Sequence, residues 1–310
     1  MIFVQIASYR DPELIPTVLD LVDKADDPTQ LRIVVAWQHD DFESIDPIKD
    51  LINFIDIPYV DSKGVCWARS LIQQQYNGEE YTLHLDSHHR FVKGWDTLLL
   101  QMYKQCQSMG SEHPLLTTYL PKYDSFTDEF INEPWQIRVE KFMDDGPLFC
   151  VPEPILNFDK LESPIPARFY SAHFAFGSGN LCKLVPHDPD YYFYGEETNI
   201  TVRAFTHGYD LYHPHKLIAW HQYKRNYRPK HWDDNVKNGN NITLPWWEHD
   251  ANATKKHRVI FGMENSTQKF ENIFGSVRTI ADYETYAGIR FADKFISEYT
   301  LNNYPAPNPI

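Results

Sequence analysis

The sequence predicts an α/β protein built on an open, mostly parallel β-sheet with helices on both faces. Apolar β-like segments alternate with amphipathic helix-like segments through residues 1–120, as in successive βα units. The β-like segments are largely apolar throughout, which is typical of strands buried on both faces of a parallel sheet. Ligands of such sheets bind beyond the carboxyl ends of the strands, so the residues that follow strands are the first candidates for a site.

The first βα unit is the clearest element. Residues 2–7 form an apolar strand candidate, and Asp11 and Pro12 then supply an N-cap and a proline suited to the first helical position. Apolar residues at helical spacing continue to Ala25, and residues 31–37 form the second buried strand. The segment between the first strand and Asp11 therefore lies at a strand's carboxyl end.

The later elements follow the same alternation up to residue 120 and resume after a break. Residues 121–165 are rich in Pro, Asp, Glu and Phe and lack a clear period, so we expect a long excursion over the sheet that faces the substrate. Gly208 is well placed to end the last of the predicted helices. We expect helices at 44–55, 65–76, 94–107 and 194–207, and strands at 57–60, 83–86, 115–120, 169–176, 210–212 and 216–220.

Composition narrows the class of protein. A hydrophobic content of 42% and an aromatic content of 15% predict a folded globule. A formal net charge of −14 excludes nucleic acid as an expected partner, because duplex binding needs a basic face. Four widely spaced cysteines without a C-x-x-C pair disfavour zinc ribbons and thioredoxin-like chemistry. Without a secretory leader or a long apolar run, we expect no membrane span and a cytoplasmic location.

A candidate metal-binding motif follows the strand that ends near residue 86. Asp86 and His88 are separated by one residue, so both side chains can point the same way as the strand ends. A carboxylate and an imidazole can hold a divalent ion against a diphosphate; Mg²⁺ prefers oxygen ligands, and the imidazole shifts the preference toward Mn²⁺. Short Asp-x-His strings also arise by chance, so a plain polar loop is the alternative.

Six ordered blocks of sequence carry a resemblance to a known family. They are SYRDPEL after the first strand, G-x-x-x-A-R, LDSHHRF, F-Y-G-E-E, W-H-Q-Y and RTIADYETYAGI near the C-terminus. With these blocks the chain resembles the GlcNAc-transferase family that includes the enzyme modifying hydroxyproline on Skp1 and the trypanosomal mucin-type GlcNAc-transferases. It is more distantly similar to the polypeptide GalNAc-transferases. Residues 121–165 carry little of the resemblance, which leaves the acceptor open.

The resemblance implies a GT-A type glycosyltransferase fold with a Rossmann-like sheet. Residues 1–230 would form the catalytic domain, with 1–120 as its nucleotide-binding half and 121–230 as its acceptor half. Residues 231–310 would be a C-terminal segment packed on that domain.

The resemblance also implies the ligands of a metal ion. Asp86 and His88 would bind Mn²⁺ or Mg²⁺, and His221 in W-H-Q-Y would be the third ligand. His213 and His215 are competing candidates for that third position, and a core imidazole is the other explanation of His221. The neighbouring His84 and His89 are expected to be structural, because alternation along the strand points them away from the metal.

Residues around the donor nucleotide are implied in the same way. Ser8, Arg10 and Asp11 would line the uridine and ribose, and the Arg69 fork would reach the diphosphate alongside Asp86. The simpler explanations are a helix cap for Asp11, a solvated side chain for Arg10 and a surface ion pair for Arg69. The last implied contact is Tyr223, which is either a stacking residue or a core residue. Tyr223, Arg225 and Arg228 lie in the segment where related enzymes carry a loop that closes over the diphosphate.

Two adjacent glutamates are the implied catalytic residues. Glu196 and Glu197 begin a helix in F-Y-G-E-E, and one of them would bind sugar hydroxyls or lie near the acceptor oxygen. The helix dipole also favours acidic residues in a first turn, which is the structural alternative.

The expected activity is metal-dependent transfer of GlcNAc from UDP-GlcNAc to a hydroxyl group, with retention of configuration. The acceptor would be protein hydroxyproline, Ser or Thr, or a glycan, and the sequence does not choose between double displacement and a front-face mechanism. One alternative is a catalytically silent sugar-nucleotide or glycan-binding module of the same fold, which the intact Asp86, His88 and His221 oppose. Another is a metal-dependent phosphate-ester hydrolase, which would need more clustered carboxylates than the chain shows.

Overall fold

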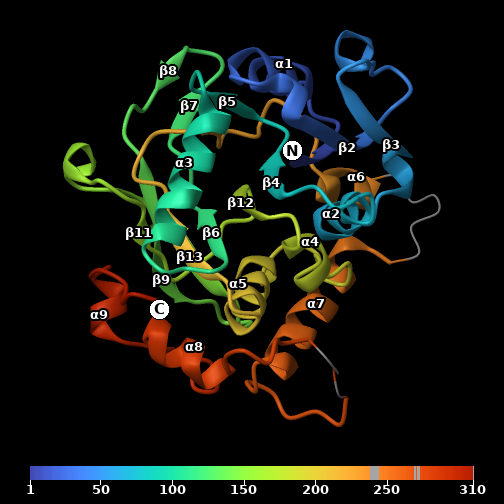
Figure 1. Cartoon of the computed structure of the whole chain (residues 1–310). Coiled ribbons are helices and arrows are strands. Elements are labelled where there is room, and N and C mark those ends of the chain that lie inside the picture. The colour runs from blue at the N-terminus through green and yellow to red at the C-terminus, as the bar shows by residue number, and fades with distance from the viewer. Residues whose placement is uncertain (238–243, 269, 271–272, 310) are drawn as a thin grey trace.

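The structure is a computed structural model that describes residues 1–237, 244–268, 270 and 273–309. Its centre is an eight-stranded sheet with the spatial order β11-β13-β6-β12-β4-β1-β2-β3 (Figure 1). The bounds of these strands are β1 Ile2–Tyr9, β2 Leu31–His39, β3 Ile52–Pro58, β4 Tyr81–Asp86, β6 Pro114–Thr117, β11 Ile165–Pro166, β12 Phe174–Ser178 and β13 Asp210–His213.

The sheet is mostly parallel, as predicted, with one antiparallel strand in its middle. Strands β4, β1, β2 and β3 run parallel to one another, and β13 runs parallel to β6. Strand β12 lies between these two groups and pairs antiparallel with both β4 and β6, while β11 is antiparallel at the edge. Because β1 and β4 are parallel, Ala7 lies opposite Asp86 and the two loops that follow meet at one edge of the sheet.

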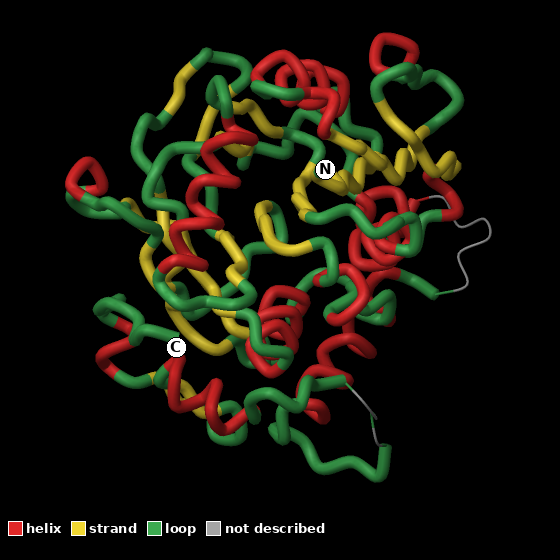
Figure 2. Tube along the Cα trace, viewed as in Figure 1, coloured by secondary structure: helices red, strands yellow, loops and turns green. Residues whose placement is uncertain are grey.

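Helices cover both faces of the sheet because both faces of its strands are apolar. On one face Val4 and Ile6 of β1 pack with residues of α1 and α3, and on the other Phe3 packs with Ile72 of α2. Buried apolar side chains of this kind provide the main favourable free energy of folding. Figure 2 shows the strands at the centre of the molecule with helices around them. The helices are α1 Leu14–Lys24, α2 Val65–Gln73, α3 Trp95–Ser108, α4 Leu181–Leu184 and α5 Glu196–Thr206, with short 3₁₀ turns at Pro28–Gln30, Asp46–Ile48, Tyr59–Asp61 and Phe158–Lys160.

The helix expected over residues 44–55 is wrong. The chain there forms only the 3₁₀ turn Asp46–Ile48 and then enters β3 at Ile52. Strand β3 pairs with β2 from Ile33↔Ile52 to His39↔Pro58. Backbone pairing with a neighbouring strand outweighs the weak local preference for helix in this segment.

A second, smaller sheet has the order β5-β14-β7-β8 and joins distant parts of the chain. Strand β14 pairs antiparallel with β5, so that His221 lies opposite His89. This pairing brings the strand predicted near residue 220 beside the Asp86–His88 loop. The bounds are β5 His89–Phe91, β7 Lys122–Asp124, β8 Glu129–Phe130 and β14 Ala219–Gln222.

The excursion over residues 121–165 contains more β structure than its composition indicates. It supplies β7 and β8 to the second sheet and then forms the hairpin β9 Trp135–Phe142 and β10 Leu148–Pro154. Its turns and prolines hide the alternation that would otherwise mark the strands.

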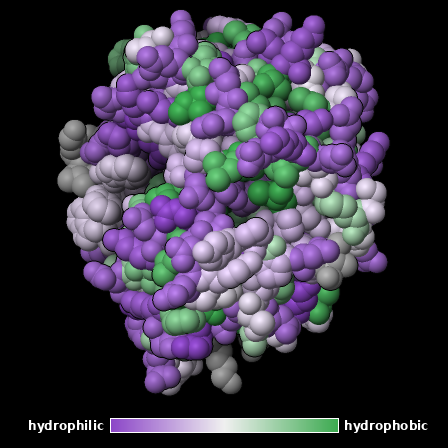
Figure 3. All heavy atoms as spheres, turned by 90° about the vertical axis from the view of Figure 1, so that its left-hand side faces the viewer, coloured by the Kyte–Doolittle hydropathy of each residue, from purple (hydrophilic) through white to green (hydrophobic). Residues whose placement is uncertain are grey.

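The C-terminal part of the chain packs against the region around α5. Tyr283 and Ala287 of α8 share a core cluster with Val202 and Phe205 of α5. On the face shown in Figure 3, hydrophobic residues form separate patches among hydrophilic ones. No helix in the described part of the chain combines the length and the apolar character needed to cross a bilayer. The elements are α6 His231–Lys237, α7 Trp246–Ile260, α8 Ile280–Ala287, β15 Ile289–Arg290, β16 Phe295–Ile296 and α9 Glu298–Leu301.

Candidate active site

One carboxylate and two imidazoles converge where the two sheets meet. Asp86 ends β4, His88 follows it in the loop to β5, and His221 comes from β14. One ligand atom from each of these three side chains lies within 4.8 Å of the others. Neither His213 nor His215, the rival candidates for the third position, belongs to this group in the described structure.

The donor atoms of this group fit a divalent cation. Nε2 of His88 is buried, has no hydrogen-bond partner among the described residues, and lies 3.7 Å from Oδ2 of Asp86. Nε2 of His221 lies 3.4 Å from the same oxygen. Burial lowers the pKa of His221 well below its ordinary value, which keeps the imidazole neutral. Two imidazoles and a carboxylate are a ligand set that suits Mn²⁺ and related ions.

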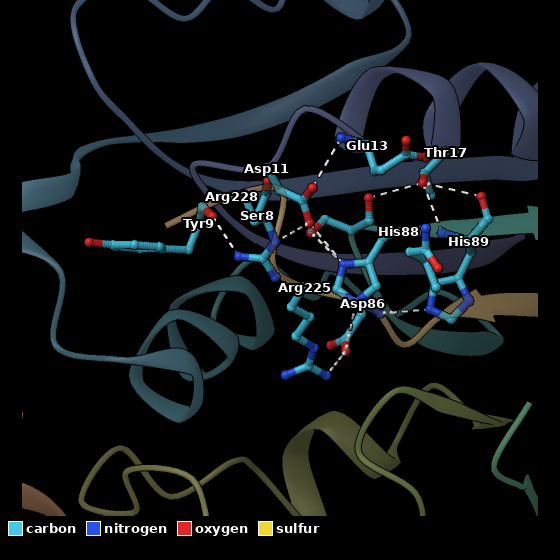
Figure 4. A network of polar contacts seen from close by, with 12 residues as sticks. Ser8, Tyr9, Asp11, Glu13, Thr17, Asp86, His88, His89, Arg225 and Arg228 are labelled. Atoms are coloured by element: carbon cyan, nitrogen blue, oxygen red, sulfur yellow. Dashed lines mark hydrogen bonds and ion pairs between the residues drawn. The ribbon is translucent and has the colours of Figure 1, made fainter. Parts of the chain in front are cut away.

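Asp11 fixes the orientation of the His88 ring from the side opposite Asp86 (Figure 4). Its Oδ2 lies 2.8 Å from Nδ1 of His88 and accepts a hydrogen bond of 2.7 Å from the Ser87 hydroxyl. Arg228 approaches the same oxygen with Nε at 3.2 Å. Although burial alone would raise the pKa of Asp11, the bond to His88 and the charge of Arg228 lower it to about 2. An ionised Asp11 holds the His88 proton on Nδ1 and leaves Nε2 free as a ligand.

Arg69 links the metal group to the first of the two glutamates. Helix α2 begins after Gly64 and carries Arg69 into the site. Gly64 has a φ of +103°, a backbone conformation that residues with a side chain rarely adopt. The guanidinium donates to Oδ1 of Asp86 at 2.7 Å and to Oε2 of Glu196 at 2.5 Å. On its other side, Oε1 of Glu196 lies 2.6 Å from Nδ1 of His187. Burial would raise the pKa of Glu196, but Arg69 and His187 lower it to about 2.

Glu197 has a different environment although it is the next residue. The Tyr119 hydroxyl donates to its Oε2 at 2.6 Å, and the Ala172 N–H donates to its Oε1 at 2.9 Å. Burial outweighs these bonds and raises its pKa to about 7. The two glutamates therefore differ in charge near neutral pH: Glu196 is ionised and Glu197 titrates.

Two clefts meet at the metal group. The lining of the first cleft includes Arg69, Arg225, Arg228 and Lys230, four cations in an acidic protein. The second cleft is lined by Glu196, Glu197, aromatic side chains and residues of β10. Arg69, Asp86, Phe193 and Arg225 line both clefts. The first cleft therefore suits an anionic ligand that ends beside Asp86.

The implied nucleotide residues lie at different depths around the first cleft. Ala7 and Tyr9 line it, whereas the Ser8 side chain is buried and its hydroxyl has no partner in the part of the chain that the structure describes. Arg10 binds Asp40 at 2.7 Å and Asp234 at 2.9 Å and does not line the cleft.

Asp11 and Tyr223 also lie away from the first cleft. Asp11 lies against Nδ1 of His88, as described above. Tyr223 lines the second cleft instead, and its hydroxyl donates to the Leu120 carbonyl at 2.8 Å.

Several residues that line or support the site belong to none of the sequence motifs. Gln38 and Ser62 line the first cleft and are joined by a hydrogen bond of 2.5 Å. His231 and Trp232 reach the same cleft from α6, beyond the predicted end of the catalytic domain at residue 230. His187 lies in a loop without periodicity, so no pattern of spacing could have indicated it.

The fold is that of a GT-A glycosyltransferase. A solved structure described as GalNAc-T7 with UDP, GalNAc and Mn²⁺ matches 99% of this chain with a TM-score of 0.63 at 14% identity. This chain spans 59% of the length of that one. A structure of residues 1–349 of S. aureus TarS matches 71% of this chain and 60% of that one, with a TM-score of 0.47 and 12% identity.

The chain belongs to the GlcNAc glycosyltransferase family. The family model described as "Glycosyltransferase (GlcNAc)" matches residues 1–49 and 46–293, which confirms the family indicated by the six sequence blocks. No curated protein matches the sequence.

Proposed function

We propose that this protein transfers GlcNAc from UDP-GlcNAc to a hydroxyl acceptor with the help of a divalent ion, most readily Mn²⁺. The observation that carries the proposal is the convergence of Asp86, His88 and His221 at the end of a cleft lined by four cations. Family membership supports the type of reaction and the sugar. GalNAc-T7, which shares the fold, has been solved with UDP and Mn²⁺.

In this proposal the chain's own residues bind and orient the two ends of the donor. Arg69, Arg225 and Arg228 face the diphosphate, and the uridine occupies the inner part of the first cleft beside Gln38 and Ser62. Asp86, His88 and His221 hold the divalent ion, which when bound neutralises charge that develops on the leaving UDP. Ser8, Arg10 and Asp11 support the cleft from behind. The Ser8 carbonyl accepts from the Gln38 amide, and Asp11 bonds to His88. Arg10 bonds to Asp234, which also accepts from the Tyr9 hydroxyl.

The second cleft is the proposed place of the donor sugar and the acceptor. Glu196 and Glu197 line it next to Tyr223, with Glu196 held by Arg69 and His187. We propose that these carboxylates contact the sugar and the acceptor hydroxyl and that configuration is retained, as the family resemblance implies. Residues 1–230 would carry this machinery, and the segment 231–310 would complete the first cleft through His231 and Trp232.

The test is the release of UDP from a panel of UDP-sugars in the presence of Mn²⁺. We expect UDP-GlcNAc to be consumed faster than UDP-Glc or UDP-Gal, and GDP- and CMP-sugars to be inert. UDP with Mn²⁺ should also stabilise the fold by mass action, by about 2.7 kcal/mol at a hundredfold excess over the dissociation constant. Binding of UDP without release from any UDP-sugar would instead identify a catalytically silent module.

A further inference from the structure

Three aromatic rings form a row on one side of the second cleft, between Glu197 and the metal group. The ring centroids of Tyr119 and His173 are 5.3 Å apart with an interplanar angle of 26°, and those of His173 and His221 are 4.2 Å apart at 20°. Tyr119 donates to Glu197 at one end of the row, and His221 lies next to Asp86 at the other. His173 therefore lies midway between the two functional groups of the cleft.

His173 carries a fixed N–H donor. The Leu120 N–H donates to Nε2 of His173 at 3.0 Å, so Nε2 has no proton and the neutral ring carries its proton on Nδ1. Among the described residues, Nδ1 has no protein acceptor. It is also absent from the fully buried polar atoms that lack a partner, so part of its surface is accessible. Since the ring lines the second cleft, this N–H is available to a ligand there.

The backbone that leads into His173 is held by several hydrogen bonds. The Ser171 N–H donates to the Thr117 hydroxyl at 2.8 Å, and the His173 N–H donates to the Ser171 hydroxyl at 3.3 Å. The Ala172 carbonyl lies 2.8 Å from Nε2 of His84, and the Ala172 N–H is bonded to Glu197. The donor of His173 and the acceptor of Glu197 are thus positioned by the same short segment before a ligand arrives.

An apolar surface adjoins this donor and acceptor. Leu148 and Cys150 of β10 pack in one hydrophobic cluster with Tyr119, the ring that stacks on His173. Both residues also line the second cleft. The cleft therefore offers an N–H donor, a carboxylate acceptor and a small apolar surface together, next to the metal group.

We propose that His173, Glu197 and the apolar surface of Leu148 and Cys150 recognise the acetamido group of the donor sugar. An acetamido group has a carbonyl acceptor, an N–H donor and a methyl group, which match Nδ1–H, the carboxylate and the apolar surface in turn. This inference rests on the proposed function and specifies which part of UDP-GlcNAc the second cleft reads. His173 is not a proton acceptor in this role, because Nε2 is bonded to the Leu120 N–H and Nδ1 already carries a proton.

The test compares two substitutions of His173. Each one preserves the hydrogen bond of one ring nitrogen and removes that of the other. His173→Gln can still accept from the Leu120 N–H but has no atom in the place of Nδ1, whereas His173→Asn keeps a donor there and loses the Leu120 contact. Each variant is assayed for UDP release from UDP-GlcNAc and from UDP-Glc, which lacks the acetamido group. We expect His173→Gln to reduce the preference for UDP-GlcNAc, measured as the ratio of kcat/KM values, roughly fivefold.

The controls separate recognition from a structural role. His173→Gln should lower kcat/KM for UDP-GlcNAc more than kcat/KM for UDP-Glc, with the affinity for UDP and Mn²⁺ near wild type. His173→Asn, which loses the Leu120 contact, should lower the Tm but keep the preference. An unchanged preference in His173→Gln, or an equal fall with both donors, would overturn the inference. Wild-type protein that uses both donors equally would overturn it while leaving UDP-sugar turnover intact, and wild-type protein that uses neither would refute the proposed function itself.

Discussion

The adjacent glutamates at the start of α5 should affect stability with opposite signs. Glu196 is paired with Arg69 at 2.5 Å and has its pKa lowered from 4.5 to about 2. Glu197 has its pKa raised from 4.5 to about 7 by burial. Replacing each by glutamine changes the shape of the side chain little and removes its charge, so the two variants are matched controls for each other.

The magnitude follows from proton linkage. Each unit of pKa difference between the folded and unfolded states changes the free energy of unfolding by about 1.4 kcal/mol. The pKa difference of either glutamate therefore amounts to about 3 kcal/mol. The lowered pKa of Glu196 stabilises the fold fully above the unfolded value of 4.5, and this contribution is lost as the pH falls toward 2. The raised pKa of Glu197 costs nothing below 4.5, and its cost grows until the pH passes about 7.

The two variants should therefore change the free energy of unfolding in opposite directions at mildly alkaline pH. Glu196→Gln should lower the free energy of unfolding by about 3 kcal/mol, since it also leaves the buried Arg69 without one of its carboxylates. Glu197→Gln should raise the free energy of unfolding by up to about 3 kcal/mol at this pH and should have little effect near pH 5. Water in the cleft screens the carboxylate, which makes about 3 kcal/mol the upper bound of the gain. Turnover should fall at least roughly tenfold in both variants with little loss of UDP affinity, because both carboxylates line the second cleft.

The assay is urea unfolding of wild type and both variants at pH values from about 5 to about 9. UDP release and UDP binding are measured on the same samples. A Glu197→Gln variant that is less stable than wild type at pH 8, or two variants with the same pH dependence, would show that the assignment of charges to this pair is wrong. Wild-type turnover in both variants would return the glutamates to a purely structural role at the helix start.

Three further outcomes test the rest of the site. His221→Ala should abolish Mn²⁺-dependent UDP release, whereas His213→Asn, at a ring bonded to the Thr117 carbonyl outside the metal group, should keep most of it; equal losses would remove His221 from the ligand set. Asp11→Asn should raise the Mn²⁺ concentration needed for half-maximal activity by roughly tenfold to a hundredfold, because Asp11 orients His88, and an unchanged Mn²⁺ titration would refute that role. Arg225→Ala should weaken UDP binding about tenfold in calorimetry, with Lys224→Ala as the control because Lys224 pairs with Asp124 instead; equal affinities in the two variants would contradict the contact with diphosphate.

The sequence alone determined the features that depend on local pattern. The apolar runs of β1 and β2 predict buried parallel strands, and Gly208, with φ of +89°, follows the end of α5 as expected. The alternation of the strand before Asp86 predicts a shared face for Asp86 and His88, and Ala7 does lie opposite Asp86 at the same sheet edge. The six sequence blocks were sufficient to indicate the family.

Only the tertiary structure decided how distant segments meet, because strand pairing across more than a hundred residues leaves no local period in the sequence. The pairing of β14 with β5 places His221, and not His213, beside Asp86. The same long-range contacts turn residues 52–58 into an edge strand, place Asp11 against Nδ1 of His88, and give Glu196 and Glu197 opposite charge environments. A residue type fixes which chemistry is available, but burial and the partners supplied by the fold decide its ionisation and the direction in which it points.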